Sequence, residues 1–464
     1  VKIMSTSLAT KPSRTDVVKM VVTIGLPLAI MLIPANELFT MQLKLYFVVT
    51  LAAILAFAFE NFNQTLVALA LPFAYTLFNI VPANVAFSPW SSNVVWMVLG
   101  GIMIADMANK TGFLKRIAYK CIILAGGTYR GIIWGLGLAG MITTILLAGN
   151  GIIPMAALAF GICIALELNR TKSATGIMLA SAFGCILSGS FIFNVGPNMY
   201  AGFAGTVMSL SWIQYFTHQI VGVIYFIVVF FLLERFCRPK EPLNGKAYFV
   251  EQYASLGKAS TAEKKAAAIC AFLLLMLLTT DIHHIQAMWV FAIVPLLAYL
   301  PGIRICDDQD MKNTNFGMVF FTAACMSIGT VGTALGIGQI VSTIAVPILA
   351  GKSVSFVFFF IYILFVLLNF VMTPVAIAAA FTMPFAQICM NLGINPEAFF
   401  LFEVVTLDQV FLPYEYVMYL VVFSFGVMQL KDFVQLMTMK FIVATLYIFL
   451  LLIPFWRLIG FLTL

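Results

Sequence analysis

Long apolar runs make up most of this chain, and short polar, glycine- or proline-containing segments separate them. A helix that spans a bilayer needs about 20 mostly apolar residues. The pattern predicts helices within a membrane in the following runs: about 18–34, 43–59, 62–81, 94–121, 131–168, 174–208, 211–234, 266–280, 284–300, 315–349, 354–390, 396–428 and 436–462.

Two of these runs, 131–168 and 354–390, are too long for one crossing, and each is interrupted near its middle, at Asn150 and at Asn369. Irregular backbone at membrane depth is tolerated where protein or a cavity covers it, so a long run with a central break is typical of a re-entrant hairpin. We therefore predict an all-α polytopic membrane protein with about eleven transmembrane helices and two re-entrant hairpins.

Basic residues predict the orientation in the membrane. The longest polar stretch, 235–265, holds seven Lys and Arg residues, and the first 19 residues hold four more. Cytoplasmic segments carry such an excess of positive charge. Six predicted spans separate the two segments, an even number, so both can be cytoplasmic. With eleven spans the C-terminus is extracytoplasmic, and we expect the plasma (inner) membrane as the location.

Composition excludes a soluble protein. Only 9% of the 464 residues are charged and 62% are hydrophobic, whereas soluble domains carry about 25% charged residues. The formal net charge of +7 is interpreted as the charge that sets topology, not as a nucleic-acid-binding surface. The eight cysteines form no CxxC pair and are interpreted as small core residues, so no cofactor is expected.

Short sequence echoes recur 219 to 221 residues apart: Val207–Leu210 with Val427–Leu430, Met97-Val98 with Met318-Val319, and Asn150 and Pro154 with Asn369 and Pro374. An odd number of predicted spans separates the copies, which therefore face opposite ways, as in transporters built from inverted repeats. This predicts four parts: 1–92, tail and scaffold helices; 93–234, first inverted repeat; 235–314, cytoplasmic loop and connecting scaffold helices; 315–464, second inverted repeat.

Each predicted repeat contains two helix breaks rich in Gly, Pro and Asn: 149–151 and 194–198 in the first, 369–374 and 412–416 in the second. The N-terminus of a half-helix offers free N–H groups and a positive dipole end to an oxyanion. Unwound carbonyls and amide oxygens suit Na⁺. No Lys or Arg lies in these segments, so helix ends, amides and hydroxyls would hold an anionic substrate. The alternative is that Gly and Pro only bend the helices for packing.

Several stretches resemble the divalent anion–sodium symporter family. These are Phe59-Glu60-Asn61-Phe62 and the segment Asn93–Lys120, which contains Gly-Gly-Ile-Met-Ile-Ala-Asp-Met-Ala-Asn-Lys-Thr-Gly-Phe-Leu-Lys-Arg. Gly189-Ser190 and Asn194-Val195-Gly196-Pro197-Asn198 stand where that family has a Gly-Thr … Gly-Thr-Pro-Pro-Asn loop. The resemblance covers roughly 35–460 and is more specific in the first half.

The resemblance implies a homodimer that carries dicarboxylates, tricarboxylates or sulfate by an elevator-like movement. The family's two Ser-Asn-Thr tips bind carboxylate and Na⁺; Asn150 matches the first, and Asn369, or in a rival alignment Thr373, matches the second. The candidate substrate-binding residues are Asn150, Gly151, Ser190, Asn194, Pro197, Asn198, Asn369, Thr373, Pro374, Tyr414 and Glu415. The candidate Na⁺ site comprises Gly149, Asn150, Gly196 and Asn198.

The chain departs from the family pattern in both halves. The first tip reads Gly-Asn-Gly, the second has no Ser-Asn-Thr, and the second Pro-Pro-Asn loop is replaced by Tyr414-Glu415-Tyr416. Glu415 is a candidate coupling or specificity residue; the alternative is that it caps the helix after Pro413. Asp408 is a weaker candidate, and Glu403 is expected near the membrane boundary.

Three classes of function compete. Two inverted units with broken helices favour a secondary active transporter of small anions over a passive channel. No Ser/His/Asp or His/Glu cluster indicates an enzyme. Within transport, Na⁺ symport, H⁺ symport and exchange of another small solute, such as a sulfonate or zwitterion, remain alternatives.

Overall fold

The computed structural model describes residues 14–36, 39–59, 62–147, 151–240, 245–337, 352–370 and 373–462. Every regular element within these ranges is a helix, which confirms the predicted all-α class. Two stretches named in the sequence analysis lie outside the described residues: Glu60 and Asn61, and the first hairpin tip at Gly149 and Asn150.

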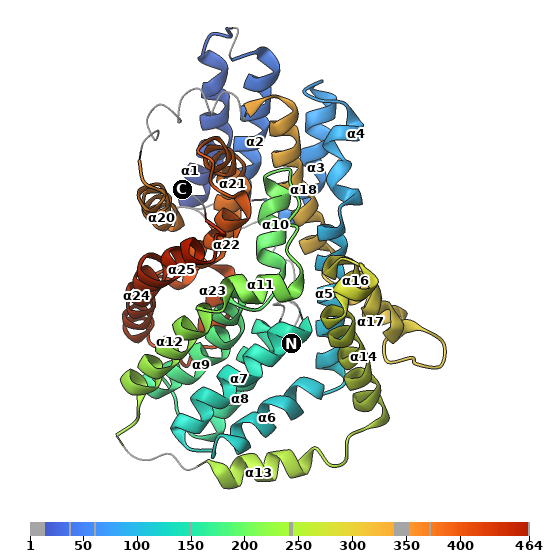
Figure 1. Ribbon diagram of the computed structural model, residues 1–464, viewed down its shortest axis with the longest axis vertical. Coiled ribbons are helices and arrows are strands. Elements are labelled where there is room, and N and C mark those ends of the chain that lie inside the picture. The colour runs from blue at the N-terminus through green and yellow to red at the C-terminus, as the bar shows by residue number, and fades with distance from the viewer. Residues whose placement is uncertain are drawn as a thin grey trace.

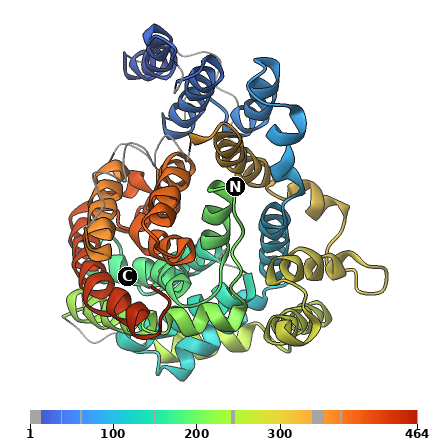
Figure 2. The same ribbon diagram turned by 45° about the horizontal axis from the view of Figure 1, so that its top comes forward.

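The N-terminal helices form one end of the molecule (Figures 1 and 2). They are α1 (Arg14–Ala29), α2 (Met41–Phe59), α3 (Gln64–Leu77) and the short α4 (Ala83–Ala86). They pack in chain order, and α18 (Phe316–Ala334), from the second half of the chain, packs against α3 and α4. The buried hydroxyls of Thr50 on α2 and Tyr75 on α3 are 2.8 Å apart and hydrogen-bonded.

The first half continues with α5 (Asn93–Lys110), α6 (Phe113–Leu124), α7 (Tyr129–Leu147), α8 (Ile152–Ala165), α9 (Lys172–Ile186) and α10 (Val195–Phe203). The sequence prediction of a single helix over 94–121 was wrong. Gly112 adopts φ +80°, a left-handed conformation that glycine tolerates and that ends a helix. The chain therefore turns between α5 and α6.

A bent pair and a polar segment connect the two halves. The pair is α11 (Trp212–Gln219) and α12 (Gly222–Cys237), which meet at 61°. The remaining helices are α13 (Lys246–Ser255), α14 (Thr261–Leu278), α15 (Thr280–His283), α16 (Ala287–Ile293) and α17 (Asp308–Asn313). Capping boxes begin α11 at Ser211 and α14 at Ser260, because a serine followed three residues later by Gln or Glu satisfies free N–H groups.

After α18, the second half contains α20 (Val354–Asn369), α21 (Pro374–Asn391), α22 (Pro396–Leu407), α23 (Val417–Ser424), α24 (Leu430–Leu446) and α25 (Ile453–Leu458). Tyr447–Leu452 form a π-helical turn between the last two. The elements follow the order of the first half: α8 and α21 begin 222 residues apart (374 − 152), and so do α10 and α23 (417 − 195). Helix α24 lies against α12 (Figure 1).

Length and composition identify fewer full spans than the eleven predicted. Among the described residues, five helices are long and apolar enough to cross a membrane, or six if the bent pair α11–α12 counts as one span. Predicted spans are shortened by breaks; the run 284–300, for example, is α16 followed by a 3-10 helix, Val294–Tyr299. The total number of crossings therefore remains a prediction.

Candidate functional site

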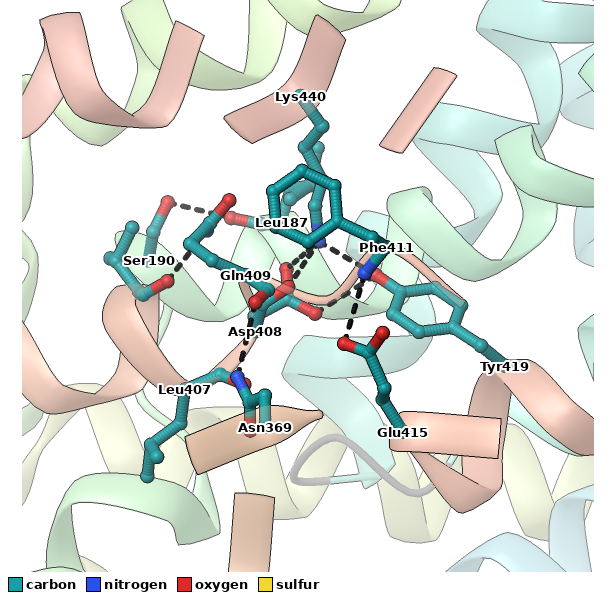
Figure 3. Close-up of polar contacts among 11 residues, drawn as sticks. Leu187, Ser190, Asn369, Leu407, Asp408, Gln409, Phe411, Glu415, Tyr419 and Lys440 are labelled. Atoms are coloured by element: carbon teal, nitrogen blue, oxygen red, sulfur yellow. Dashed lines mark hydrogen bonds and ion pairs between the residues drawn. The ribbon is translucent and has the colours of Figure 1, made fainter. Parts of the chain in front are cut away.

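Two interrupted helices meet inside the molecule. We call the gap between α9 and α10 the first break and the gap between α22 and α23 the second break. In the first half, α9 is followed by a 3-10 turn, Leu187–Ser190, and α10 begins only at Val195. In the second half, α22 ends at Leu407 and α23 begins at Val417. Helix α22 packs against both the 3-10 turn and α10. Figure 3 shows Leu187 and Ser190 of the first half together with Asp408 and Gln409 of the second half.

The two halves also interlock at their hairpins. Helix α10 contacts α21, the second helix of the second predicted hairpin, and α23 contacts α8, the second helix of the first predicted hairpin. Each half-helix after a break therefore packs against the hairpin of the other half. This exchange brings the two predicted break regions into one buried zone, which is the candidate functional site.

Asn194 organises the first break. Its amide nitrogen donates to the carbonyls of Gly189 (2.8 Å) and Ile192 (3.0 Å), and its amide oxygen accepts from the Gly196 N–H (2.9 Å). The Tyr215 hydroxyl also donates to the Gly189 carbonyl, at 2.7 Å. Asn194 is therefore the N-cap of α10, the usual role of Asn before a helix.

The other predicted residues of the first break are buried close to Asn194. The Asn198 amide donates to the Asn194 carbonyl at 3.2 Å, and the Ser190 hydroxyl donates to the Leu187 carbonyl at 2.6 Å. Pro197 is buried at the third position of α10. Residues 187–203 include no charged side chain, so this break is polar and electrically neutral.

The described side of the first hairpin tip lies against this break. A Cβ added to Gly151 would be 2.8 Å from the Thr143 hydroxyl oxygen and 3.6 Å from the Cys185 sulfur, at the end of α9. One residue along α7, the Thr144 hydroxyl accepts from the Ser188 hydroxyl at 2.9 Å. The structure thus brings Gly151 next to the end of α9.

The second hairpin reaches the second break through Asn369. The Asn369 amide nitrogen donates to the carbonyls of Leu407 (3.3 Å) and Gln409 (3.1 Å), and its buried amide oxygen has no partner among the described residues. Thr373 is the N-cap of α21 and Pro374 its first residue, a position that suits proline because its missing N–H is not needed there.

Glu415 has both carboxylate oxygens engaged by backbone. They accept from the N–H groups of Phe411 (3.0 Å) and Leu412 (2.9 Å), and the residue is 1% exposed (Figure 3). These contacts cap the 3-10 turn Pro413–Glu415, and not the helix α23 that follows it, whose N-cap Tyr416 has no side-chain cap hydrogen bond. Tyr414 lies in the same 3-10 turn, and the placement of its side chain is outside the described part.

The second break contains the side chain of a lysine from a distant segment of the chain. Lys440 of α24 is fully buried, and its ammonium lies 2.7 Å from Asp408 Oδ2 and 3.2 Å from the Tyr419 hydroxyl. It also donates to the Asp408 carbonyl oxygen. No Lys or Arg lies within the break segments of the sequence, but the fold brings Lys440 to the second break from α24. The signal in the sequence was a single lysine inside the apolar run 436–462.

Glu403, which the sequence analysis expects near the membrane boundary, lies on α22 within the protein interior. It is completely buried, and Oε1 accepts from the Thr382 hydroxyl of α21 at 2.5 Å. Its other carboxyl oxygen has no partner among the described residues. The helix α22 presents it toward α21 because the two helices pack closely. Within the described ranges, no group of three His, Cys, Asp or Glu residues is arranged to hold a metal ion.

These features define a class: an all-helical membrane protein in which two interrupted helices, related by the order of the elements, meet in a buried polar zone. This is the architecture of secondary transporters. Residues 14–462 match the family described as the sodium:sulfate symporter transmembrane region, and the chain belongs to that family. It is an integral membrane protein and a secondary transporter of anions, and it is not an enzyme.

A solved structure supports the fold. The chain is similar to the YdaH transporter of Alcanivorax borkumensis, whose crystal structure is described as having an unusual topology. The TM-score is 0.50 with 14% sequence identity, and the match covers 97% of this chain and 99% of that one. At this identity the similarity concerns the fold alone. No curated protein matches the chain.

Proposed function

We propose that this protein is a secondary active transporter that moves a small divalent anion, of the dicarboxylate or sulfate type, together with a cation. The observation that carries the proposal is the meeting of the two breaks, α9–α10 and α22–α23, in one buried polar zone. Free helix ends and amides are the groups that hold oxyanions and small cations in such transporters. Membership of a sodium:sulfate symporter family supports both ligand classes.

The first break is the stronger candidate for the anion. It is neutral from residue 187 to 203, so no acid in this segment repels a dianion there. The N-terminus of α10 adds a positive dipole end. We assign the substrate contacts in this half to Asn150, Gly151, Ser190, Asn194, Pro197 and Asn198, and those in the second half to Asn369, Thr373, Pro374 and Tyr414. Glu415 supports the second half as a cap, because its carboxylate oxygens accept from backbone N–H groups.

We place the Na⁺ site at Gly149, Asn150, Gly196 and Asn198, where backbone carbonyls and amide oxygens supply hard ligands. Proton coupling is the second candidate. It is favoured by Glu403, because that buried carboxyl has one hydrogen bond, from Thr382, and one oxygen without a partner among the described residues. Sodium-independent exchange of a sulfonate or zwitterion is an outcome that the transport experiment distinguishes.

We infer an elevator-type movement in a homodimer. Residues 1–92 and 235–314 form the scaffold, and 93–234 and 315–464 form the two inverted repeats. Within the repeats we place α5 and α18 with the scaffold, because α5 packs against α16 and α18 against α3. The hairpins and the interrupted helices then make up the moving body that carries the site.

Counterflow in proteoliposomes tests the substrate class without assuming any coupling ion. Vesicles preloaded with unlabelled succinate, sulfate, a sulfonate or an amino acid are given the labelled solute outside, first without gradients and then with inward Na⁺ or H⁺ gradients. We expect counterflow with a divalent anion and stimulation by one cation gradient. Counterflow with zwitterions alone would overturn the proposed substrate class, and counterflow that ignores both gradients would overturn cation coupling.

A further inference from the structure

We propose that Lys440 is a built-in cation that occupies the cation position of the second break, so that this half of the transporter binds no Na⁺. The inference rests on the proposed function and names its coupling stoichiometry. The gap between α22 and α23 leaves backbone carbonyl and N–H groups without helical partners, and side chains of this chain satisfy them.

The carbonyls at the end of α22 are all taken. Asn369 donates to the Leu407 and Gln409 carbonyls, and the Lys440 ammonium donates to the Asp408 carbonyl between them (Figure 3). Unwound carbonyls at the C-terminal end of a half-helix are the groups that coordinate Na⁺ in transporters with broken helices. In this chain an ammonium lies where that ion would bind.

The number of contacts matches an ammonium. Lys has three N–H donors, and three oxygens surround Lys440: the Asp408 carbonyl, Asp408 Oδ2 at 2.7 Å and the Tyr419 hydroxyl at 3.2 Å. The ammonium also lies over the rings of Phe183 and Tyr419, 5.7 and 5.1 Å from their centroids, contacts that favour a cation. No donor on Lys440 remains for a further ligand.

The position of Lys440 does not suit a purely structural role. It lies on the buried face of α24 with Phe433, Leu436, Met437 and Ala444. An apolar residue would pack there at no cost in desolvation, and a buried ion pair is often no more stable than apolar residues of similar volume. A charge that is retained inside a membrane domain indicates a functional site.

The free N–H groups of the same break also bind a charged side chain of the protein itself. The Phe411 and Leu412 N–H groups would attract an anion, and they bind the carboxylate of Glu415 instead. The second break therefore carries its own cation and its own anion. The first break is neutral from 187 to 203, and among the described residues the hydrogen bonds of Ser190, Asn194 and Asn198 join them only to neutral groups. This leaves the coupling ion of the proposed function to that half.

Equilibrium binding of ²²Na⁺ to the purified full-length protein tests the inference. We expect the wild type to bind at most one Na⁺ per chain. Lys440→Met removes the ammonium and leaves the Asp408 carboxylate and carbonyl open, so this variant should bind one Na⁺ more than the wild type. The matched control, Lys440→Met with Asp408→Asn, removes both charges and should return to the wild-type number.

Two Na⁺ per wild-type chain would overturn the inference, and this result does not depend on any variant being stable. A folded Lys440→Met protein with no additional Na⁺ would overturn it as well, and so would a double variant that keeps the additional ion. If the wild type binds no Na⁺ while Lys440→Met gains one, the proposed Na⁺ coupling fails and the role of Lys440 stands.

Discussion

Charged side chains inside this molecule find partners that lie far away in the sequence. Asp408 pairs with Lys440, 32 residues on, and Arg116 pairs with Glu263, 147 residues on. Glu415 is different, because its partners are the N–H groups three and four residues before it. Local sequence, with Pro413 marking the break, was therefore sufficient to single out Glu415. It could not find Lys440, since only the packing of α24 brings that side chain to the site.

Glu415→Gln tests the capping role at the residue scale. The substitution replaces one of two acceptor oxygens by an NH₂ group, which cannot accept a hydrogen bond. We therefore expect the free energy of unfolding to fall by about 1 kcal/mol. The dependence of uptake on pH should stay unchanged. Thermal unfolding of the purified protein and uptake between pH 5.5 and 8.5, roughly the range where buried carboxyls and His titrate, provide the two readouts.

Glu251→Gln is the control for that prediction, because Glu251 lies exposed on α13. It should alter neither quantity. A Glu415→Gln protein of wild-type stability whose uptake has lost its pH dependence would contradict capping and assign Glu415 to coupling.

The Arg116–Glu263 pair predicts a pH-dependent stability. The guanidinium donates to both carboxylate oxygens, at 2.8 and 3.0 Å, and holds the pKa of Glu263 below its usual value. The pair therefore stabilises the fold above the pKa of an unfolded Glu, about 4.3. That stability is lost as the pH falls through the lowered pKa of the folded state.

Comparison with Glu263→Gln measures this contribution. The wild type should unfold at a higher temperature than the variant at pH 7, and the difference should shrink as the pH falls and vanish below the lowered pKa of folded Glu263, where this residue is protonated in both states. A difference that grows as the pH falls would show that the sign of the pKa shift is wrong.

At the scale of elements, breaks were predictable where local chemistry ends a helix. Asn194 and Pro413 mark two interruptions in the described part of the chain. The turn at Gly112 and the 61° bend between α11 and α12 were missed. Polar residues precede both bends, Asn109-Lys110-Thr111 at the first and Thr217-His218-Gln219 at the second. The runs 94–121 and 211–234 are nevertheless apolar on average, and average hydrophobicity does not distinguish a bent helix from a straight one.

Helix α18 depends on a glycine for its contact with α10. A Cβ added to Gly329 would be 1.5 Å from the Phe203 carbonyl oxygen, a backbone atom that no rotamer change can move. We expect Gly329→Ala to lower the free energy of unfolding by about 1–3 kcal/mol. The melting temperature of the purified protein and the yield of monodisperse protein report this loss.

Gly161→Ala is the matched control in a helix of the same fold. No atom lies within 4 Å of a Cβ added there, and alanine favours helix over glycine by about 1 kcal/mol, so the melting temperature should stay the same or rise. Equal melting temperatures for both variants would contradict the close approach of α10 and α18.

At the scale of the whole molecule, the order of the elements repeats across the two halves, as the short echoes in the sequence indicate. The hairpins α7–α8 and α20–α21 and the interrupted helices α9–α10 and α22–α23 occupy corresponding places. The exchange by which α10 meets α21 and α23 meets α8 was not predictable, because pattern alone does not specify which helices touch. The inverted orientation and the dimer remain predictions.

The dimer is tested by the mass of the purified protein. Native mass spectrometry of protein released from mild detergent should give twice the mass of one chain. A single-chain mass in protein that retains uptake would contradict the dimer and leave the transport mechanism to one chain.

Concentrative uptake in proteoliposomes shows whether this protein is a secondary active transporter of divalent anions. With an inward Na⁺ gradient, and in a parallel set an inward H⁺ gradient, we expect labelled succinate or sulfate to rise transiently above its external concentration under at least one of them. An ionophore that collapses the driving gradient should abolish the excess. Entry that only equilibrates the solute, whatever cation gradient is imposed, would contradict secondary active transport of a divalent anion.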